Sequence, residues 1–320
     1  MRFENLVNKY KKLGVNTVST LMRIVFLCGF CYIILYPVIL MISRGVMDRI
    51  DLVDNEVILI PKHFTWENFK VAAMLLDYGE SLKNTAFVTV TCTICSVATC
   101  LLTGYAFGRF DFPGKNLLFG VVLFTVVVPP QLIMIPLYMR FKSFDIAGII
   151  KAVSGDSANL LNTFWPFIIL SLSGMGIKSG IFIYLFRQFF KGMPKELEEA
   201  AMVDGANTFT VFYRIMLPNA RTIIVTVVLF SLVWQYNDIV FSQLFLTTQR
   251  VLPMQYVNLE RFTSAVLEYL GFAAGDVQVG LYTPLVQSAG ALLILGPLLI
   301  MFLILQKFFV ESVERSGIVG

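Results

Sequence analysis

Cys92 and Cys95 form a C-x-x-C pair, a spacing that occurs in redox and zinc sites. A structural zinc site needs four ligands, and the sequence has neither a second such pair nor any histidine besides His63. All five cysteines lie within apolar runs, where free cysteine packs as a small hydrophobic residue. We therefore expect the cysteines to be structural and expect no metal site.

Gly114 and Lys115 are a second pair whose types suggest chemistry, because a glycine–lysine step ends many phosphate-binding loops. Such a loop needs a glycine five places before Gly114 and a serine or threonine after the lysine. Arg109 and Asn116 stand at those positions. This turn therefore provides no nucleotide site, and we expect the chain to bind no cofactor of its own.

Four polar side chains interrupt long apolar runs and are the candidates for a solute path. They are Gln131, Lys178, Asn237 and Asp238. A charge at membrane depth costs at least ~2.5 kcal/mol, so such side chains usually face the interior of a helix bundle or water. A packing explanation stays open for each residue. The helix after Lys178 could begin nearer Gly180, with the lysine side chain reaching to the interface. Gln131 could simply lie at a packing kink, and Asn237 and Asp238 could form hydrogen bonds to a neighbouring helix.

The segment from Pro194 to Pro218 is polar and carries helix signals at both ends. Pro194 suits the first position of a helix, where its missing N–H would be unpaired anyway. Three glutamates follow and favour the positive end of the helix dipole: Glu196, Glu198 and Glu199. We expect this helix to end at Asp204 and Gly205, because glycine is the common left-handed terminator.

A second helix is predicted after this turn, with Asn207 or Thr208 as its cap. The first helix has only a small apolar surface, made of Leu197, Ala200 and Ala201. A helix so short is marginal by itself. We therefore expect a protein partner to cover it.

The composition indicates which elements carry these residues. The chain has 320 residues, of which 57% are hydrophobic and 14% charged, and the apolar residues form long runs. This is typical of an all-α, polytopic membrane protein. The net charge of +4 says little about partners, because the placement of lysine and arginine matters more than their sum. We expect no nucleic-acid partner.

Six apolar segments are long enough to cross a bilayer as helices. Their approximate bounds are 24–43, 84–107, 117–138, 164–186, 222–245 and 283–305. A basic tail, 1–23, precedes them, and basic residues flank an insert at 187–221. By the positive-inside tendency both the insert and the two tails, 1–23 and 307–320, lie in the cytoplasm, and 24–306 form the transmembrane domain.

Two periodic patterns predict how these segments pack. A ridge of small residues recurs at every fourth position and allows a neighbouring helix to come close. It consists of Ser96, Cys100, Gly104 and Gly108. In the outer segment between the first two spans, helical spacing predicts a short amphipathic helix lying against the membrane face. Its apolar residues are Trp66, Phe69, Ala73 and Leu76.

The stretch EAAMVDGANTFTVFYRIMLP resembles the cytoplasmic signature of ABC importer permeases. That signature is Glu-Ala-Ala, a glycine after three more residues, and Ile-x-Leu-Pro after nine more. Each position is matched, by Glu199, Ala200, Ala201, Gly205, Ile215, Leu217 and Pro218. The flanking stretches FGRFDFPGKNLLF, VVPPQLIMIPLYM and WQYND resemble the carbohydrate-uptake branch, typified by the shorter membrane subunit of maltose importers.

This resemblance implies a type I ABC importer transmembrane-domain fold of about six spans in the cytoplasmic membrane of a prokaryote. The first helix of the insert, with Asp204 at its end, would be a coupling helix seated in an ABC ATPase dimer that binds ATP and magnesium. An extracytoplasmic solute-binding protein would deliver the sugar, and a second, different permease subunit would complete the pathway within the membrane lipid. The chain would be a transport subunit without enzymatic activity.

Two features depart from the family pattern. The outer loop Asp145–Ala158 is longer than usual, and the tail ends SVERSGIVG rather than Gly-Ala-Val-Lys-Gly.

Other functions fit part of the sequence. An importer for peptides, phosphonates or another solute would share the signature, but the flanking stretches favour sugars, in particular oligosaccharides. An integral-membrane enzyme would need clustered His, Asp or Glu at membrane depth or a nucleotide loop, and a passive channel would need no docking insert.

Overall fold

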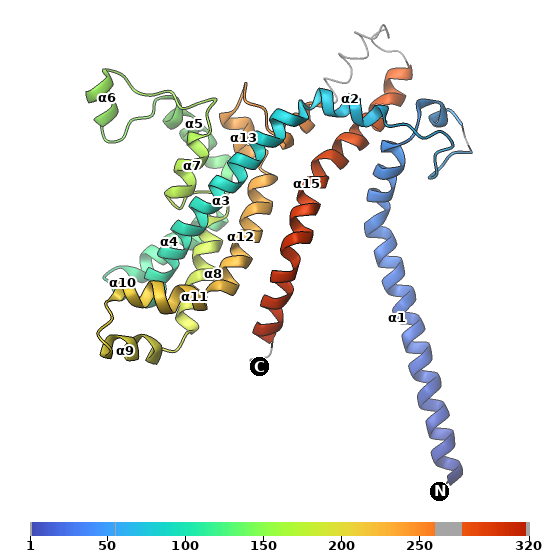
Figure 1. The fold of residues 1–320 in the computed structure, drawn as a ribbon, viewed down its shortest axis with the longest axis horizontal. Helices are drawn as coiled ribbons and strands as arrows, with labels where there is room; N and C mark the ends of the chain where they lie inside the picture. The colour runs from blue at the N-terminus through green and yellow to red at the C-terminus, as the bar shows by residue number, and fades with distance from the viewer. Residues whose placement is uncertain (1, 55, 260–276, 318–320) are drawn as a thin grey trace. The chain divides into compact units, whose positions relative to one another are not determined.

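The computed structural model describes the backbone of residues 2–54, 56–259 and 277–317, which forms helices joined by loops (Figure 1). Strand-type pairing in this described part is limited to two isolated bridges, Met47–Phe64 and Phe144–Ala158. The architecture is therefore all-α, as the apolar runs predict. The chain forms two compact units: the first consists of Met1–Leu75 and Leu259–Leu293, and the second of Leu76–Asn258 and Ile294–Gly320.

In the first unit, α1 (Arg2–Gly45) is one continuous helix, so the expected basic tail is helical and runs directly into the first span. Most of its apolar side chains from Leu21 to Ile42 are exposed. The end of α1 is held by the buried Asn68, whose amide donates to the carbonyl oxygens of Gly45 at 3.1 Å and Met47 at 2.8 Å. These bonds satisfy carbonyls that a helix end leaves unpaired.

Asn68 belongs to α2 (Glu67–Leu75), which is the short helix that the outer segment predicts. Its fully buried residue is Ala72, which packs with Val286 and Ala289 of α15 (Val277–Gly317). Trp66, just before the helix, is 70% exposed. The helix is thus present, but its buried face centres on Ala72 because α15 covers that side.

The loop between α1 and α2 contains η1 (Arg49–Leu52) and a buried carboxylate, Asp51. Its two oxygens accept hydrogen bonds from the backbone N–H of His63 at 2.8 Å and meet the Nδ1 atom of the same residue at 2.7 Å. The pair ties the two ends of this loop together.

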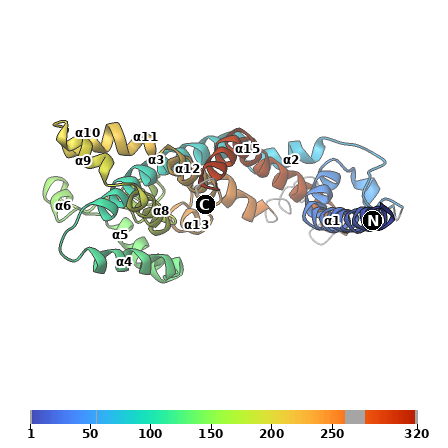
Figure 2. The ribbon, with the colours of Figure 1, turned by 90° about the horizontal axis from the view of Figure 1, so that it is seen from below.

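The second unit holds most of the remaining helices. They are α3 (Tyr78–Arg109), α4 (Lys115–Val127), η2 (Pro130–Ile133), α5 (Met134–Lys142), α6 (Ile149–Ser154), α7 (Trp165–Leu172), α8 (Ser179–Gly192), α9 (Glu196–Val203), α10 (Thr208–Val211), η3 (Phe212–Met216), α11 (Leu217–Asn219), α12 (Arg221–Tyr236) and α13 (Val240–Phe245). Its centre is α3, which packs against α7, α8 and α12 (Figures 1 and 2).

The ridge of small residues on α3 faces α8, and the predicted close approach is confirmed. A Cβ atom on Gly104 would lie 3.0 Å from the backbone N of Arg187 and against the Cβ of Phe186, and one on Gly108 would lie 3.0 Å from the Cβ of Phe190. Further along, the Sγ of Cys100 lies 3.6 Å from the backbone oxygen of Ser179. Only small side chains permit such contact.

The cysteines behave differently in the two units. Cys92 and Cys100 are buried in α3, as their apolar surroundings predict, whereas Cys28 and Cys31 are exposed on α1. All five are free thiols.

By length and composition, three described helices could each cross a membrane: Ser19–Gly45, Tyr78–Arg109 and Tyr282–Lys307. Two more spans arise if bent pairs are counted, namely Lys115–Val127 with Pro130–Lys142, bent by 102°, and Thr208–Asn219 with Arg221–Tyr236, bent by 72°. The described residues therefore contain three to five candidate spans, where the sequence predicts about six.

The predicted span 222–245 is divided into α12 and α13, and its bent pair includes residues of the predicted insert. The difference in number arises at the predicted span 164–186, which is divided into α7 and α8. Between them Gly174 has φ +72° and Lys178 has φ +59°, a backbone conformation that cannot continue a right-handed helix. The eight residues of α7 rise only about 12 Å, less than the ~30 Å of a bilayer core. The small and polar residues in the middle of this segment explain the division.

The predicted span 117–138 is bent where Pro129 and Pro130 separate α4 from η2, as the prolines suggest. Proline disfavours the α conformation in the residue before it and lacks the N–H that a helix needs. The predicted tail 307–320 continues α15 to Gly317, and residues 318–320 lie outside the described part.

Candidate docking surface and solute path

The polar insert folds as the helix, glycine turn and helix that the sequence predicts. α9 begins at Glu196 with Lys195 as its cap, so Pro194 precedes the helix and does not occupy its first position as predicted. The helix ends before Asp204, and Gly205 has φ +85°. Beyond the glycine, the backbone N–H of Ala206 donates to the carbonyl oxygen of Ala201 at 3.0 Å. This bond across a left-handed glycine is the usual way in which a helix end satisfies its carbonyl groups.

Of the two capping residues that the sequence offers, Asn207 caps α10. Its side-chain oxygen accepts the backbone N–H of Thr210 at 2.8 Å. The chain then continues through η3, a stretch of π-helix, into α11. The Nδ2 atom of Asn219 donates to the carbonyl oxygen of Ile215 at 2.7 Å and closes this segment.

One face of the insert packs into the second unit. Val211 and Met216 are fully buried, and the ring of Phe212 contacts that of Tyr105 of α3, with 4.7 Å between the centroids and a tilt of 49°. Tyr105 in turn contacts Phe190 of α8 at 5.2 Å. The insert is therefore fixed against α3 and α8.

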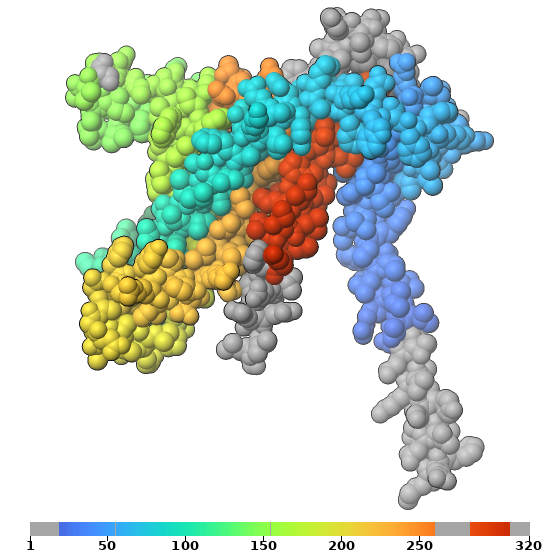
Figure 3. Space-filling model, in the orientation of Figure 1, coloured from blue at the N-terminus to red at the C-terminus, as the bar shows by residue number. Residues whose placement is uncertain are grey.

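The insert also carries five exposed apolar side chains. The exposed fractions are 42% for Leu197, 49% for Met202, 87% for Val203, 76% for Phe209 and 63% for Tyr213. Figure 3 shows this segment, in yellow and gold, as a continuous projecting surface. Exposed apolar residues on one short insert suggest a surface for another protein, so we name these five residues the docking surface.

An ion pair joins the insert to the end of α3. The Nε of Arg109 lies 3.1 Å from the Oε1 of Glu198, and the two side chains are only 3% and 15% exposed. The Nη2 of Arg109 also donates to the carbonyl oxygens of Met193 at 3.0 Å and Pro194 at 3.3 Å. One guanidinium group therefore contacts α9 at Glu198 and the link between α8 and α9 at Met193 and Pro194.

Sequence reasoning missed this role of Arg109. A basic residue at the end of a span indicates topology, but no local spacing connects it to a glutamate in a helix far along the chain. Only the packing of α3 against α8 brings the two together.

The residues of the signature occupy both faces of the insert. Glu199, Ala200, Asp204, Gly205 and Pro218 are exposed, whereas Ala201, Ile215 and Leu217 are half-buried. The signature therefore combines residues that a partner can reach with residues that hold the insert in place.

The four candidate residues for a solute path are placed by three different segments. Lys178 stands at the start of α8, with its Nζ 5.7 Å from the ring centroid of Trp234 on α12. Because α8 begins at Ser179, Lys178 precedes the helix, which is the alternative that the sequence left open. Its ammonium group contacts an aromatic face, as cations commonly do.

Asn237 and Asp238 follow α12 and make local hydrogen bonds. The Nδ2 of Asn237 donates to the carbonyl oxygen of Val233 at 2.8 Å, and the Oδ1 of Asp238 accepts the backbone N–H of Phe241 at 3.2 Å. Both bonds satisfy backbone groups at helix ends. Gln131 lies exposed in η2. The structure therefore places Lys178 against α12, the helix directly before Asn237 and Asp238.

Comparison with known proteins gives a consistent result. Residues 100–315 match the family described as binding-protein-dependent transport system inner membrane component. A probable ABC transporter permease of Pyrococcus horikoshii is 30% identical over 246 residues, which cover 77% of this chain and 76% of that protein. A galactooligosaccharides transport system permease of Bacillus subtilis is 25% identical over 308 residues, covering 95% and 96%.

A solved structure shares the fold. It is that of a bacterial ABC transporter involved in the import of the acidic polysaccharide alginate, and one of its chains matches with a TM-score of 0.68. The two sequences are 21% identical, and the match covers 91% of this chain and 96% of that chain.

Proposed function

We propose that this chain, which belongs to the family of binding-protein-dependent transport system inner membrane components, carries sugars, and oligosaccharides in particular, across the membrane. Members of this family are multi-pass permeases of the inner membrane, so the chain is a transport subunit and not an enzyme. The sugar cargo is supported by the galactooligosaccharide permease among the relatives and by the flanking stretches around the signature.

The observation that carries the coupling role is the exposed docking surface on an insert that the second unit holds rigidly. A partner that moves this surface must also move α3, because Arg109 and Glu198 join α9 to the end of α3. We infer that closure of an ATPase dimer pushes on α9 and that this push reorients the spans between inward-open and outward-open states. Glu199, Ala200, Asp204 and Gly205 would contact the ATPase.

The partners follow at two levels. Membership of the family implies an ATPase and a solute-binding protein. We further propose that the second permease is a different chain, and that ATP and magnesium bind in the ATPase while this chain binds no cofactor. Gln131, Lys178, Asn237 and Asp238 are proposed to contribute to the solute path.

The proposal is tested by assembling the chain in proteoliposomes with its ATPase, its partner permease and the solute-binding protein. We expect an oligosaccharide, but not a peptide or a phosphonate, to stimulate ATP hydrolysis and to accumulate inside. Stimulation by a peptide or phosphonate alone would overturn the cargo, and failure of the ATPase to co-purify with the chain would overturn the docking role.

A further inference from the structure

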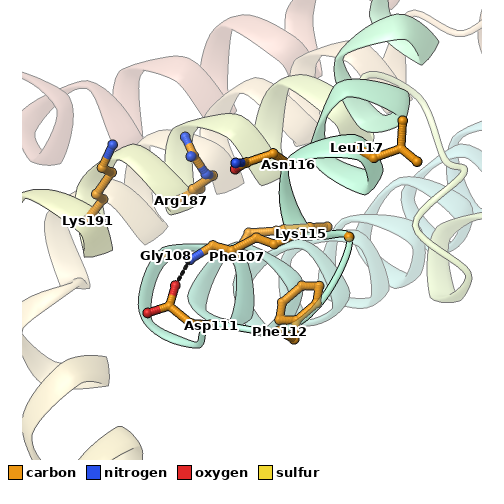
Figure 4. Close-up of a pocket in the computed structure, with 10 residues that line it drawn as sticks. Phe107, Gly108, Asp111, Phe112, Lys115, Asn116, Leu117, Arg187 and Lys191 are labelled. Atoms are coloured by element: carbon orange, nitrogen blue, oxygen red, sulfur yellow. Dashed lines mark hydrogen bonds and ion pairs between the residues drawn. The ribbon is translucent and has the colours of Figure 1, made fainter.

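A cavity of about 410 Å³ lies between the turn that joins α3 to α4 and the last turns of α8 (Figure 4). All of its lining belongs to the second unit. The lining residues are Phe107, Gly108, Asp111, Phe112, Gly114, Lys115, Asn116, Leu117, Arg187 and Lys191. The cavity is separate from the docking surface, since it shares no residue with it.

The lining carries three positive charges and one negative charge. Lys115 pairs with Asp111, with 3.0 Å between the Nζ and the Oδ1, and this bond lowers the pKa of the Asp111 carboxyl. Arg187 and Lys191, from successive turns of α8, take part in none of the ion pairs among the described residues. The cavity therefore has an excess of positive charge.

Arg187 is held in place and yet incompletely bonded. Its guanidinium lies 4.0 Å from the ring centroid of Phe119, and its Nη1 donates to the side-chain oxygen of Gln188 at 3.3 Å. The Nε atom is buried and has no hydrogen-bond partner within the described part of the chain. Because this buried Nε cannot meet a ligand, an anion would bind at the terminal nitrogens, where the guanidinium fork matches the oxygens of a phosphate.

The start of α4 adds a second source of positive potential. This 13-residue helix begins at Lys115, whose N–H donates to the carbonyl oxygen of Phe112 at 3.3 Å. Its cap residue Gly114, with φ +79°, has no side chain to accept the N–H groups of the next two residues. Unpaired N–H groups and the helix dipole both favour an anion at such an end.

The outer face of α4 is apolar from the cavity onward. Leu117 lines the cavity and is 75% exposed, and the same helical stripe continues through Val121 and Phe124, which are 54% and 66% exposed. The lysines and arginines at this end place the turn in the cytoplasm, where the anionic lipids of a membrane attract basic groups. A molecule with an anionic head and an apolar tail fits both features at once.

We propose that this cavity binds the phosphate group of an anionic phospholipid, whose acyl chain lies along Leu117, Val121 and Phe124 of α4. Occupancy would bridge the α3–α4 turn to α8, the two elements that hold the insert. The lipid would thereby stabilise the part of the permease on which the ATPase acts.

The test uses the purified, intact transporter in phosphatidylcholine nanodiscs to which phosphatidylglycerol is added, with bound lipid counted by native mass spectrometry. Lys191→Gln is the informative variant, because Lys191 is exposed and its loss leaves the packing of α8 unchanged. We expect it to weaken phosphatidylglycerol binding about five-fold, which corresponds to ~1 kcal/mol. Arg187→Gln should weaken it at least as much.

The matched control is Arg221→Gln, which removes one exposed positive charge at the start of α12, away from the cavity. It should leave binding unchanged. Equal binding by the wild type and the Lys191→Gln variant would overturn the proposal.

A second arm separates a lipid from a soluble anion. Leu117→Glu should abolish phosphatidylglycerol binding by placing a charge on the path of the acyl chain. If inorganic phosphate at millimolar concentration displaces the lipid from the wild type, and Leu117→Glu has no effect, the site binds a soluble phosphate and the lipid assignment is wrong.

Discussion

Arg109 and Glu198 form the contact in which a single side chain holds the start of the insert. Both are nearly buried, and Arg109 has further bonds to two backbone carbonyl groups. Removing one partner of a buried pair leaves the other charge uncompensated, which costs more than the pair itself contributes. The position of α9 therefore depends on this contact.

We predict that Glu198→Gln loosens α9 and weakens coupling. Amide hydrogen exchange in 196–203 should become about tenfold faster, since ~1.4 kcal/mol corresponds to a factor of ten. Stimulation of ATP hydrolysis by the loaded binding protein should fall in the same variant. Glu196→Gln is the control, because Glu196 is exposed on the same helix and should tolerate the change. Equal exchange in both variants would contradict the role of the ion pair.

Asp51 and His63 provide a second prediction at this scale, on the loop between α1 and α2. Burial raises the pKa of Asp51, but the hydrogen bonds from the backbone and ring of His63 lower it by more, so that the net pKa lies below its ordinary value. A carboxyl with a lowered folded pKa contributes stability that is present above the unfolded pKa and is lost as the pH falls through the folded pKa.

Hydrogen exchange in 46–66 should therefore become faster in the wild type, relative to Asp51→Asn, as the pH falls below ~4. At neutral pH the Asp51→Asn variant should already exchange faster than the wild type. Asp54→Asn is the comparison, because Asp54 pairs with Lys62 at the surface and should matter little. A constant ratio of the rates of wild type and Asp51→Asn across this pH range would argue against the account.

At the scale of elements, the contact between α3 and α8 determines where the insert can lie. The ridge that ends at Gly108 brings the two backbones close together, and Arg109 follows at once. The small residues on α3 therefore have two effects. They allow close packing of α3 and α8, which is what holds helices together where lipid provides no hydrophobic driving force. They also bring the end of α3 to the start of α9.

Gly104→Ala tests this contact. The added methyl group would lie 3.0 Å from the backbone N of Arg187 and 3.1 Å from the carbonyl oxygen of Ile183. Both are backbone atoms, which cannot rotate away as a flexible side chain could. We expect a loss of ~1–3 kcal/mol and a lower melting temperature of the purified complex. Gly120→Ala on α4 is the matched control, since nothing lies within 4 Å of its new Cβ and alanine is the better helix former by ~0.5–1 kcal/mol. A stabilising effect of both changes would refute the close approach.

The turn between α9 and α10 supports a further prediction. Gly205 has φ +85° and open space around it, so a substitution there strains the backbone but does not disturb the core. Gly205→Arg should therefore leave the subunit inserted and assembled while uptake falls well below that of the wild type and ATP hydrolysis no longer responds to solute. Gly205→Asn, which tolerates the left-handed conformation, should retain much of the activity. Unchanged uptake in reconstituted vesicles after Gly205→Arg would count against the coupling role.

At the scale of the whole molecule, the chain divides its tasks between regions. The insert and its anchor on α3 lie at one end of the second unit, and the candidate residues for the solute path lie elsewhere, with Lys178 beside Trp234. If the proposed roles hold, this separation would allow coupling and cargo choice to vary independently.

The prediction at this scale concerns cargo and coupling together. Replacing Gln131, Lys178, Asn237 and Asp238 by alanine should raise the KM for solute uptake while basal ATP hydrolysis stays unchanged. Gln188→Ala, on the exposed side of α8, should change neither. If transport kinetics remain those of the wild type after all four substitutions, these residues only pack or cap helices.

The sequence by itself determines the features that depend on short spacing. The three glutamates and Gly205 specify a short helix and its end, although the start lies two residues after Pro194. The four-residue period of the ridge specifies a close helix contact. Both features depend on neighbours along the same helix. The family signature in the sequence also indicates that the chain is an importer permease, which the family match confirms.

Tertiary structure decides everything that joins distant segments. It pairs Arg109 with Glu198, places Arg187 and Lys191 around a cavity at the start of α4, and covers Ala72 with α15. It also shows that the apolar segment 164–186 is two helices. Such contacts result from how whole helices pack against one another, and the spacing of residues within one helix carries no record of which distant side chain it will meet.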